Sequence, residues 1–206
     1  MTKREQSKQK RRERIVEVAE KLFFEKGINN ATMDEVTKLT KFSKATVYSY
    51  FPSKDELFFT ICQRGNEILQ QKLNEAIENH ELGVDKVRAI GFAFFDFANN
   101  YPHYYRFISY FVSGSDFAIP EEMESKMLHL DKTLTKCIEL GIQDGSIKPV
   151  NALLVSKCLW AMATGTLQLI FQKGELLEKH LGIDKHSIFQ TFFQLLEASL
   201  ATELAN

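Results

Sequence analysis

The sequence predicts an all-α protein of about nine helices. Apolar residues recur at helical spacing along most segments, and only ten glycines and four prolines interrupt a chain of 206 residues. Of these residues 44% are hydrophobic and 26% are charged, which is typical of a soluble globular protein. The length is sufficient for one or two domains, each with a core of its own.

The first expected helix covers residues 10–26. Its apolar residues fall at i, i+3, i+4, i+7 and i+8 and form a single stripe, made of Ile15, Val18, Ala19, Leu22 and Phe23. Gly27 is the expected end of this helix. The polar residues 1–9 are expected to be frayed.

Two short helices and a longer one are expected next. Thr32 and Glu35 have the spacing of a capping box, which opens a helix that ends near residue 39. Ser43 is a capping residue for a second short helix over residues 44–50. Pro52 ends that helix, and a longer one follows to about residue 78. Two short helices joined by a tight turn are typical of a helix-turn-helix motif.

The second short helix has one apolar face and one polar face. Val47 and Phe51 are four residues apart, so both are expected to point inward. The other residues are small, hydroxyl-bearing or cationic and suit contact with the DNA major groove: Lys44, Ala45, Thr46, Tyr48, Ser49 and Tyr50. The alternative is an ordinary amphipathic helix with a solvated face, and this segment alone does not separate the two.

The net charge of −1 conceals an uneven distribution. Residues 1–58 carry 13 Lys and Arg against 9 Asp and Glu, whereas the remainder carries 13 against 18. The first part therefore suits a polyanionic partner. Its basic residues gather before residue 15 and predict an arm that contacts the DNA backbone, with a solubilising tail as the alternative.

The N-terminal quarter resembles the DNA-binding domain of the TetR family of bacterial transcriptional regulators. The resemblance lies in Arg14-Ile15-Val16 leading to Leu22-Phe23 and Gly27, in residues 32–36, and in residues 43–57. It implies a helix-turn-helix domain over residues 1–55 and a helical effector-binding and dimerisation domain over residues 56–206. The family usually has Ala-Gly where this chain has Thr40-Lys41, and we therefore expect a turn there that is strained or differently shaped.

The resemblance also implies a homodimer that binds a near-palindromic double-stranded operator. Its two helix-turn-helix domains are expected about one turn of the DNA helix apart or slightly more. Lys44, Thr46, Tyr48 and Tyr50 are expected at the major groove, beside Ala45. The backbone phosphates are assigned to Thr32, Ser43, Ser49 and Lys54.

The rest of the chain is expected to form helices over residues 85–100, 103–112, 120–143, 151–172 and 185–204, with a short helical piece between Gly174 and Gly182. A strand over residues 106–112 is the alternative for one segment. Eleven of the 24 aromatic residues lie between Phe92 and Phe117.

These aromatic residues are either a packed core or, in part, the wall of a cavity for a small apolar or aromatic effector. The resemblance favours an effector site, and the candidate residues are Phe92, Phe95, His103, Tyr104, Phe107, Phe111, Trp160, Met162, Thr164 and Gln168.

The last two helices are the expected dimer interface, because the resemblance implies a four-helix contact between subunits. The candidate residues are Ala161, Gly165, Phe189, Phe192, Phe193 and Leu196. Burial of these residues within one subunit is the alternative.

No sequence pattern points to catalysis. The five histidines lack metal-ligand spacing, no nucleophile or phosphate-binding motif is found, and we predict no metal and no cofactor. The three cysteines are dispersed, which indicates a reduced, cytoplasmic protein, and no segment is a convincing membrane span. The sequence therefore predicts a DNA-binding transcriptional repressor released by an apolar effector. The alternatives are a helical protein that binds or sequesters small molecules, and an enzyme with a hydrophobic substrate.

Overall fold

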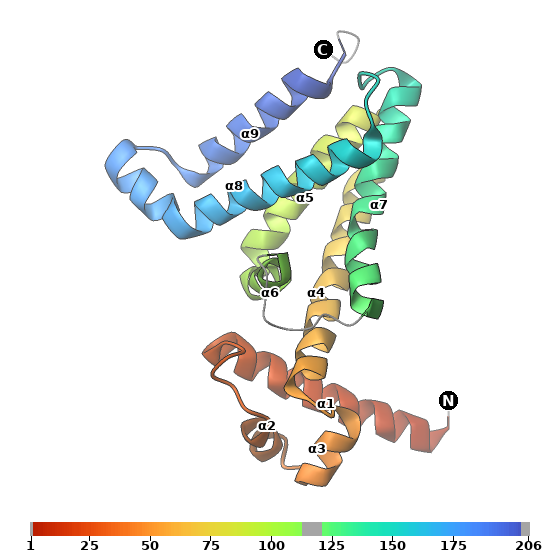
Figure 1. Ribbon diagram of the computed structural model, residues 1–206, viewed down its shortest axis with the longest axis vertical. Helices are drawn as coiled ribbons and strands as arrows, with labels where there is room; N and C mark the ends of the chain where they lie inside the picture. The colour runs from red at the N-terminus through yellow and green to blue at the C-terminus, as the bar shows by residue number, and fades with distance from the viewer. Residues whose placement is uncertain (1, 113–120, 203–206) are drawn as a thin grey trace. The chain divides into compact units, whose positions relative to one another are not determined.

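The computed structural model describes residues 2–112 and 121–202, and it describes side chains outside residues 110–131. Within these ranges the protein is all-α, as predicted, and its one extended pairing is an isolated bridge between Ile147 and Ala201. The helices (Figure 1) are α1 (Lys3–Lys26), α2 (Met33–Thr40), α3 (Lys44–Tyr50), α4 (Lys54–Ile77), α5 (Gly83–Asn100), α6 (Pro102–Val112), α7 (Glu121–Asp144), α8 (Ala152–Leu181) and α9 (Lys185–Leu200).

Helix α1 begins seven residues before the predicted start. Thr2 and Glu5 form a capping box, in which the Glu5 N–H donates to the Thr2 hydroxyl at 3.3 Å. The Thr2 N–H donates in return to a Glu5 carboxylate oxygen at 2.7 Å. The prediction of a frayed segment over residues 1–9 was therefore wrong for the residues that the helix includes.

One expectation and one alternative further along the chain were also wrong. Helix α8 continues through Gly174, which is buried, because the glycine leaves room for the side chain of Lys185 against the helix. It ends at Gly182, which is in the left-handed region with φ 68°. Residues 106–112 belong to helix α6, so the strand alternative for this segment is excluded.

The chain divides into two compact units, and neither is one continuous stretch. The first unit contains α1–α3, helix α4 up to Glu67 and helix α6 from Arg106 onward. The second unit contains the rest of α4 and α6 together with α5 and α7–α9. This division differs from the predicted single boundary at residue 55, because side chains of α6 take part in the core of the first unit.

The first unit has an aromatic core centred on Phe58 of α4, which is fully buried. Its ring lies 6.4 Å from that of Phe23 on α1 and 4.9 Å from that of Phe107 on α6. Phe107 also lies 5.4 Å from Phe24. Rings at these separations pack favourably edge to face, so α6 closes the core that positions α2 and α3.

The second unit has a close contact between α5 and α7. A Cβ added to Gly83 would lie 2.1 Å from the Gly141 backbone nitrogen, so two glycines allow the helices to meet. The first amides of α5 are capped by the segment that ends α7. The Gly83 N–H donates to Asp144 at 2.7 Å, and the Val84 N–H donates to Ser146 at 3.2 Å. Helices α8 and α9 form an antiparallel pair beside α5 and α7 (Figure 1).

Candidate functional site

Helix α3 is fixed by its N-cap and by its two apolar residues. The Ser43 side chain accepts a hydrogen bond from the Thr46 N–H at 3.1 Å, as a capping residue should. Val47 is fully buried and Phe51 is nearly so, which confirms that these positions point inward. The backbone of α3 is therefore held against the core of the first unit.

The opposite face of α3 is open. Lys44, Ala45, Tyr48 and Ser49 are exposed, whereas Thr46 and Tyr50 are half-buried. A short helix that presents an ammonium group, hydroxyls and a methyl group can lie in a major groove. Six of the predicted DNA-binding residues thus lie on one short helix.

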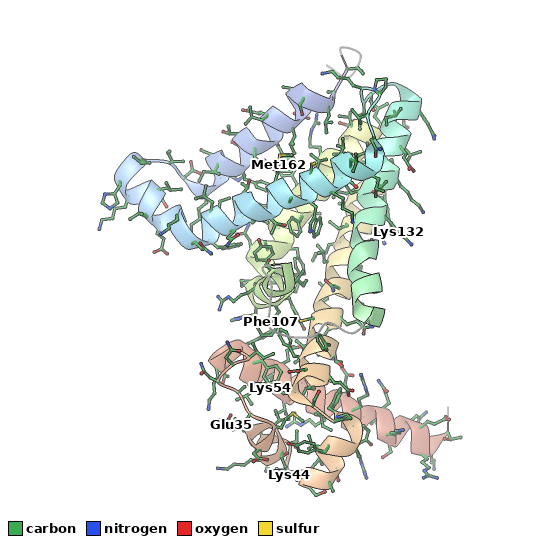
Figure 2. The ribbon with its side chains drawn as sticks, viewed as in Figure 1. Glu35, Lys44, Lys54, Phe107, Lys132 and Met162 are labelled. Carbon is green, nitrogen blue, oxygen red and sulfur yellow. The ribbon has the colours of Figure 1, made fainter. Side chains whose placement is uncertain are left out.

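Lys44, at the start of α3 (Figure 2), has an intramolecular partner on α2. Its ammonium nitrogen lies 2.8 Å from an Asp34 carboxylate oxygen and 5.7 Å from the centre of the Tyr48 ring. The hydrogen bond to Asp34 raises the pKa of Lys44. Because both charged groups are exposed, this pair is weak enough to be exchanged for a phosphate or a base edge.

Lys41 occupies the turn between α2 and α3 in the left-handed region, with φ 61° and ψ 20°. It is the only residue other than glycine with positive φ in the described part of the chain. A side chain costs energy in this region, which is the strain expected where the family has glycine.

Replacement of Lys41 by Gly is expected to stabilise the protein by about 0.5–1 kcal/mol, since relief of the left-handed strain exceeds the added flexibility of the unfolded chain. The midpoint of urea unfolding measures the effect. Lys38→Gly, on the exposed side of α2, is the control and should cost about 1 kcal/mol. Equal destabilisation by both changes would contradict the strain at Lys41.

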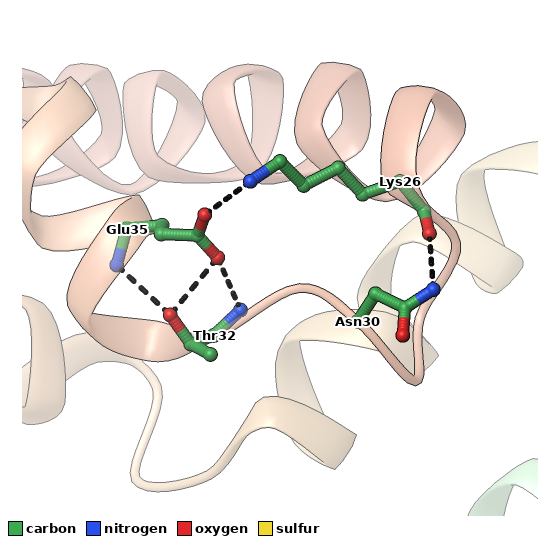
Figure 3. A network of polar contacts seen from close by, with 4 residues as sticks. All are labelled: Lys26, Asn30, Thr32 and Glu35. Carbon is green, nitrogen blue, oxygen red and sulfur yellow. Dashed lines mark hydrogen bonds and ion pairs between the residues drawn. The ribbon is translucent and has the colours of Figure 1, made fainter.

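Thr32 and Glu35 form the predicted capping box at the start of α2, within a wider polar network (Figure 3). The Glu35 N–H donates to the Thr32 hydroxyl at 3.2 Å, and that hydroxyl donates to the Glu35 carboxylate at 3.0 Å. Lys26 at the end of α1 forms an ion pair with Glu35. Asn30 donates to the Lys26 carbonyl oxygen at 3.1 Å. The network joins the end of α1 to the start of α2.

This network predicts a pH dependence of stability. The hydrogen bond from Lys26 and then those from Thr32 lower the pKa of Glu35 below its ordinary value of 4.5. A carboxyl group with a lowered folded-state pKa stabilises the fold above its unfolded pKa and loses that contribution as the pH falls. Glu35→Gln should therefore lower the urea midpoint at pH 7, and the difference from the unaltered protein should shrink below pH 4.5. A difference that stays constant with pH would contradict this assignment.

Lys54 has a structural role that the sequence did not indicate. Its ammonium group donates to the carbonyl oxygens of Ile28 and Ala31 at 2.8 and 3.3 Å, and so ties the start of α4 to the loop before α2. An ammonium group has three donors, and two of them are used here. Contact of Lys54 with phosphate stays a prediction.

The predicted effector residues whose side chains are described fall in several places. Phe107 belongs to the core of the first unit, and the Phe111 side chain lies outside the described ones. Phe92 and Phe95 stack on the α9 residues Phe193 and Phe189. The others are dispersed in the second unit: Tyr104 is buried, His103 and Thr164 are half-buried, and Met162 (Figure 2) and Gln168 are exposed on α8.

Of the predicted effector residues with described side chains, Trp160 lines an apolar cavity in the second unit. The cavity measures about 30 Å³, room for about one or two water molecules. Sequence patterns did not indicate most of the residues that line the cavity. These residues come from four helices, and the sequence does not specify how those helices cross. The walls are Val87, Ile90, Gly91, Phe94, Leu134, Leu159, Trp160, Ala163, Phe192, Phe193 and Leu196.

The predicted interface residues fall into two groups. Phe189 and Phe193 are buried against α5 in the same subunit, as the alternative held, and Phe192 and Leu196 are half-buried beside them. Ala161 and Gly165 are exposed on α8. They belong to a longer stripe of exposed residues, the rest of which was not predicted at the interface. The α8 stripe consists of Leu154, Cys158, Ala161, Gly165 and Leu169.

The α8 stripe has steps of four, three, four and four residues, so its members share one side of the helix. The buried residues of α8, among them Leu159, Leu167 and Ile170, lie on the other side. By length and composition alone α8 is also apolar enough to cross a membrane. Within the fold, one of its sides packs on α7 and α9.

Three comparisons agree with this geometry. The family model for bacterial regulatory proteins of the tetR family matches residues 15–61. The HTH-type transcriptional regulator YhgD of Bacillus subtilis is 28% identical over 178 residues, which are 86% of this chain and 90% of that protein. The HTH-type transcriptional activator FasR of Mycolicibacterium smegmatis is 31% identical over 175 residues, which are 84% of this chain and 78% of that protein.

A solved structure shows the same fold. A tetR-family regulatory protein from Rhodococcus RHA1 superposes with a TM-score of 0.70 at 17% identity, over 94% of this chain and 99% of that one. Regulators of this family bind DNA as homodimers and are typically soluble and cytoplasmic. With an exposed α3 face, a matching family model and a relative at 31% identity, the chain belongs to the tetR family of bacterial regulatory proteins and is a DNA-binding transcriptional regulator, not an enzyme.

Proposed function

We propose that this protein is a homodimeric repressor that reads a near-palindromic operator with α3 and is released from it by a small apolar effector. The observation that carries the proposal is the open face of α3, where Lys44, Ala45, Tyr48 and Ser49 are exposed on a helix with a fixed backbone. Side chains that reach base edges from a rigid element give sequence specificity.

Within that face, we assign Lys44, Thr46, Tyr48 and Tyr50 to the major groove. Lys44 supplies a cation, Tyr48 supplies a hydroxyl, Tyr50 supplies a rigid ring, and Thr46 supplies a methyl group for thymine. The phosphates are assigned to Thr32, Ser43, Ser49 and Lys54, beside the N–H groups that open α2 and α3. In the free protein these hydroxyls bond within the chain, so contact with DNA requires them to rotate.

Dimerisation is proposed to use the α8 stripe. Leu154 is 62% exposed and Leu169 is 44% exposed in the isolated subunit, and both flank the small residues Ala161 and Gly165. A stripe of this kind is suited to close approach of a second copy of the same helix. Leu195 on the neighbouring α9 is 68% exposed and is a further large apolar side chain open to a partner.

The effector is proposed to enter the cavity that Trp160 lines. All of its wall residues are apolar or aromatic, which selects an uncharged apolar molecule. Because the cavity is nearly filled, a ligand must displace wall residues such as Phe193 of α9. An effector that binds more tightly to the arrangement of the dimer that does not fit the operator lowers the affinity for DNA by the same factor.

The experiment that tests DNA binding is a gel shift with the promoter beside the protein's own gene, at several salt concentrations, with a shuffled duplex as control. We expect a steep salt dependence and a preference for the promoter. Tyr48→Ala should weaken promoter binding by about 1–3 kcal/mol and leave the dimer intact. Absence of any preference for the promoter would refute the proposal.

Effector binding and the direction of regulation need separate measurements. Trp160 is the only tryptophan, so quenching or a shift of its fluorescence reports an apolar ligand in the cavity without DNA. A reporter under the same promoter should be expressed more strongly when the protein is deleted. The relative FasR is named an activator, and loss of reporter expression on deletion would assign that role here instead.

A further inference from the structure

The first turns of α1 extend beyond the core of the first unit. Residues 3–11 are all exposed, and the buried residues of α1 begin at Ile15. These turns have no apolar face whose packing could stabilise them. The capping box at Thr2 stabilises them instead. The basic residues before residue 15 are therefore held on a helix with defined faces.

One face of this extension forms a groove with α3. The hollow measures about 480 Å³ and is lined by Glu5, Lys8, Gln9 and Arg12 of α1 and by Tyr50 of α3. Lys8 and Arg12 are four residues apart and so lie one turn above the other on the same side of α1. Glu5 is the one acidic wall residue, and its carboxylate accepts the Thr2 N–H in the capping box.

Arg12 is held in place at this groove. Its guanidinium group lies 5.0 Å from the centre of the Phe51 ring, and it donates to the Thr60 hydroxyl at 3.5 Å. Among the described residues, no carboxylate forms an ion pair with Arg12 or Lys8. A positioned guanidinium group with donors left over is suited to a phosphate oxygen.

We propose that this groove binds the sugar–phosphate backbone of the operator, with Lys8 and Arg12 each neutralising a phosphate. The Tyr50 ring stays at the major groove, and its hydroxyl donates to a phosphate oxygen from the other wall. The inference rests on the proposed reading of DNA by α3, because Tyr50 belongs to that helix and places the groove beside the bases that α3 contacts. It assigns the α1 extension to affinity and not to sequence preference.

The geometry separates these residues from the other cations of the extension. Lys10 is two positions from Lys8 and from Arg12, which places it on the opposite side of α1. A basic tail that acts only through its net charge would use Lys8 and Lys10 equally. A groove that positions phosphates would use Lys8 and not Lys10, so this pair makes a matched comparison.

The test measures the dissociation constant of the full-length protein for the promoter and for a shuffled duplex over a range of salt concentrations. The proposed dimer carries Lys8 twice, so for Lys8→Gln we expect the slope of log K against log salt to fall by about 1.8, and affinity at 0.1 M salt to fall roughly 30- to 100-fold for both duplexes. Lys10→Gln should leave the slope unchanged. Tyr50→Phe should weaken both duplexes equally and leave the slope unchanged.

Arg12→Gln should act as Lys8→Gln does, and the double variant, which removes four cations from the dimer, should lower the slope by about 3.6. Because Arg12 also contacts Phe51, Arg12→Lys serves as its control and should retain the slope, with unfolding midpoints measured for each variant. Equal loss for Lys8→Gln and Lys10→Gln, or no loss for either, overturns the groove while promoter preference still supports the regulator. A protein that binds neither duplex in dilute salt overturns both proposals.

Discussion

Replacement of Phe58 by Ala is expected to destabilise the first unit by about 3–5 kcal/mol. Phe58 is fully buried, and its ring packs against Phe23 and Phe107, so truncation leaves a cavity that helices on three sides cannot fill. Urea unfolding followed by circular dichroism measures the loss. Trp160 lies in the second unit, so its fluorescence reports that unit separately.

Phe59→Ala is the matched control for this experiment. Phe59 is the next residue on α4 and is half-buried, so its truncation should cost clearly less than that of Phe58. We expect the Phe58 variant to lose promoter binding along with its dichroism transition, because α3 depends on this core. A shift in the Trp160 transition alone would contradict the placement of Phe58 in the first core.

Replacement of Gly165 by Glu is expected to convert the dimer into monomers and to lower promoter affinity by about 10²–10⁴-fold. The α8 stripe places this residue between Ala161 and Leu169, and two carboxylates buried against each other would be strongly unfavourable. Promoter affinity falls because binding at the second half-site is then no longer intramolecular. Analytical ultracentrifugation measures the first effect, and the gel shift measures the second.

Leu153→Glu is the control for the interface. Leu153 is 56% exposed and lies beside Leu154 in sequence, but the helical turn places it outside the α8 stripe. It should add the same charge to α8 and leave both the dimer and promoter binding intact. Monomers from both changes would point to general repulsion, and dimers from both would remove the stripe from the interface.

Local patterns predicted the first unit well. The capping residues Thr32 and Ser43 and the inward positions Val47 and Phe51 depend on neighbours within four residues, and the structure confirms each. A single departure from the family pattern predicted a turn at Thr40-Lys41 that is strained or differently shaped, and Lys41 lies there in the left-handed region. Signals of this kind are short in range, so one chain is sufficient to read them.

The second unit depends on contacts that sequence spacing does not specify. Gly174 was expected to end a helix, but its lack of a side chain makes room for Lys185 from another helix. Phe189 and Phe193 have the spacing of a surface stripe, yet α5 covers them. The start of α1 differs from the prediction because the capping box at Thr2 stabilises a helix that its polar sequence does not indicate.

The placement of Phe107 has a consequence for building hybrid sensors from this protein. An engineer who joins residues 1–67 to the sensing body of another regulator would omit a ring that covers Phe24 and Phe58. The transferred DNA-binding unit would then expose apolar surface and would aggregate. A working hybrid must also contain residues 106–112 of this protein. DNA binding and effector sensing therefore cannot be exchanged between regulators at a single fusion point.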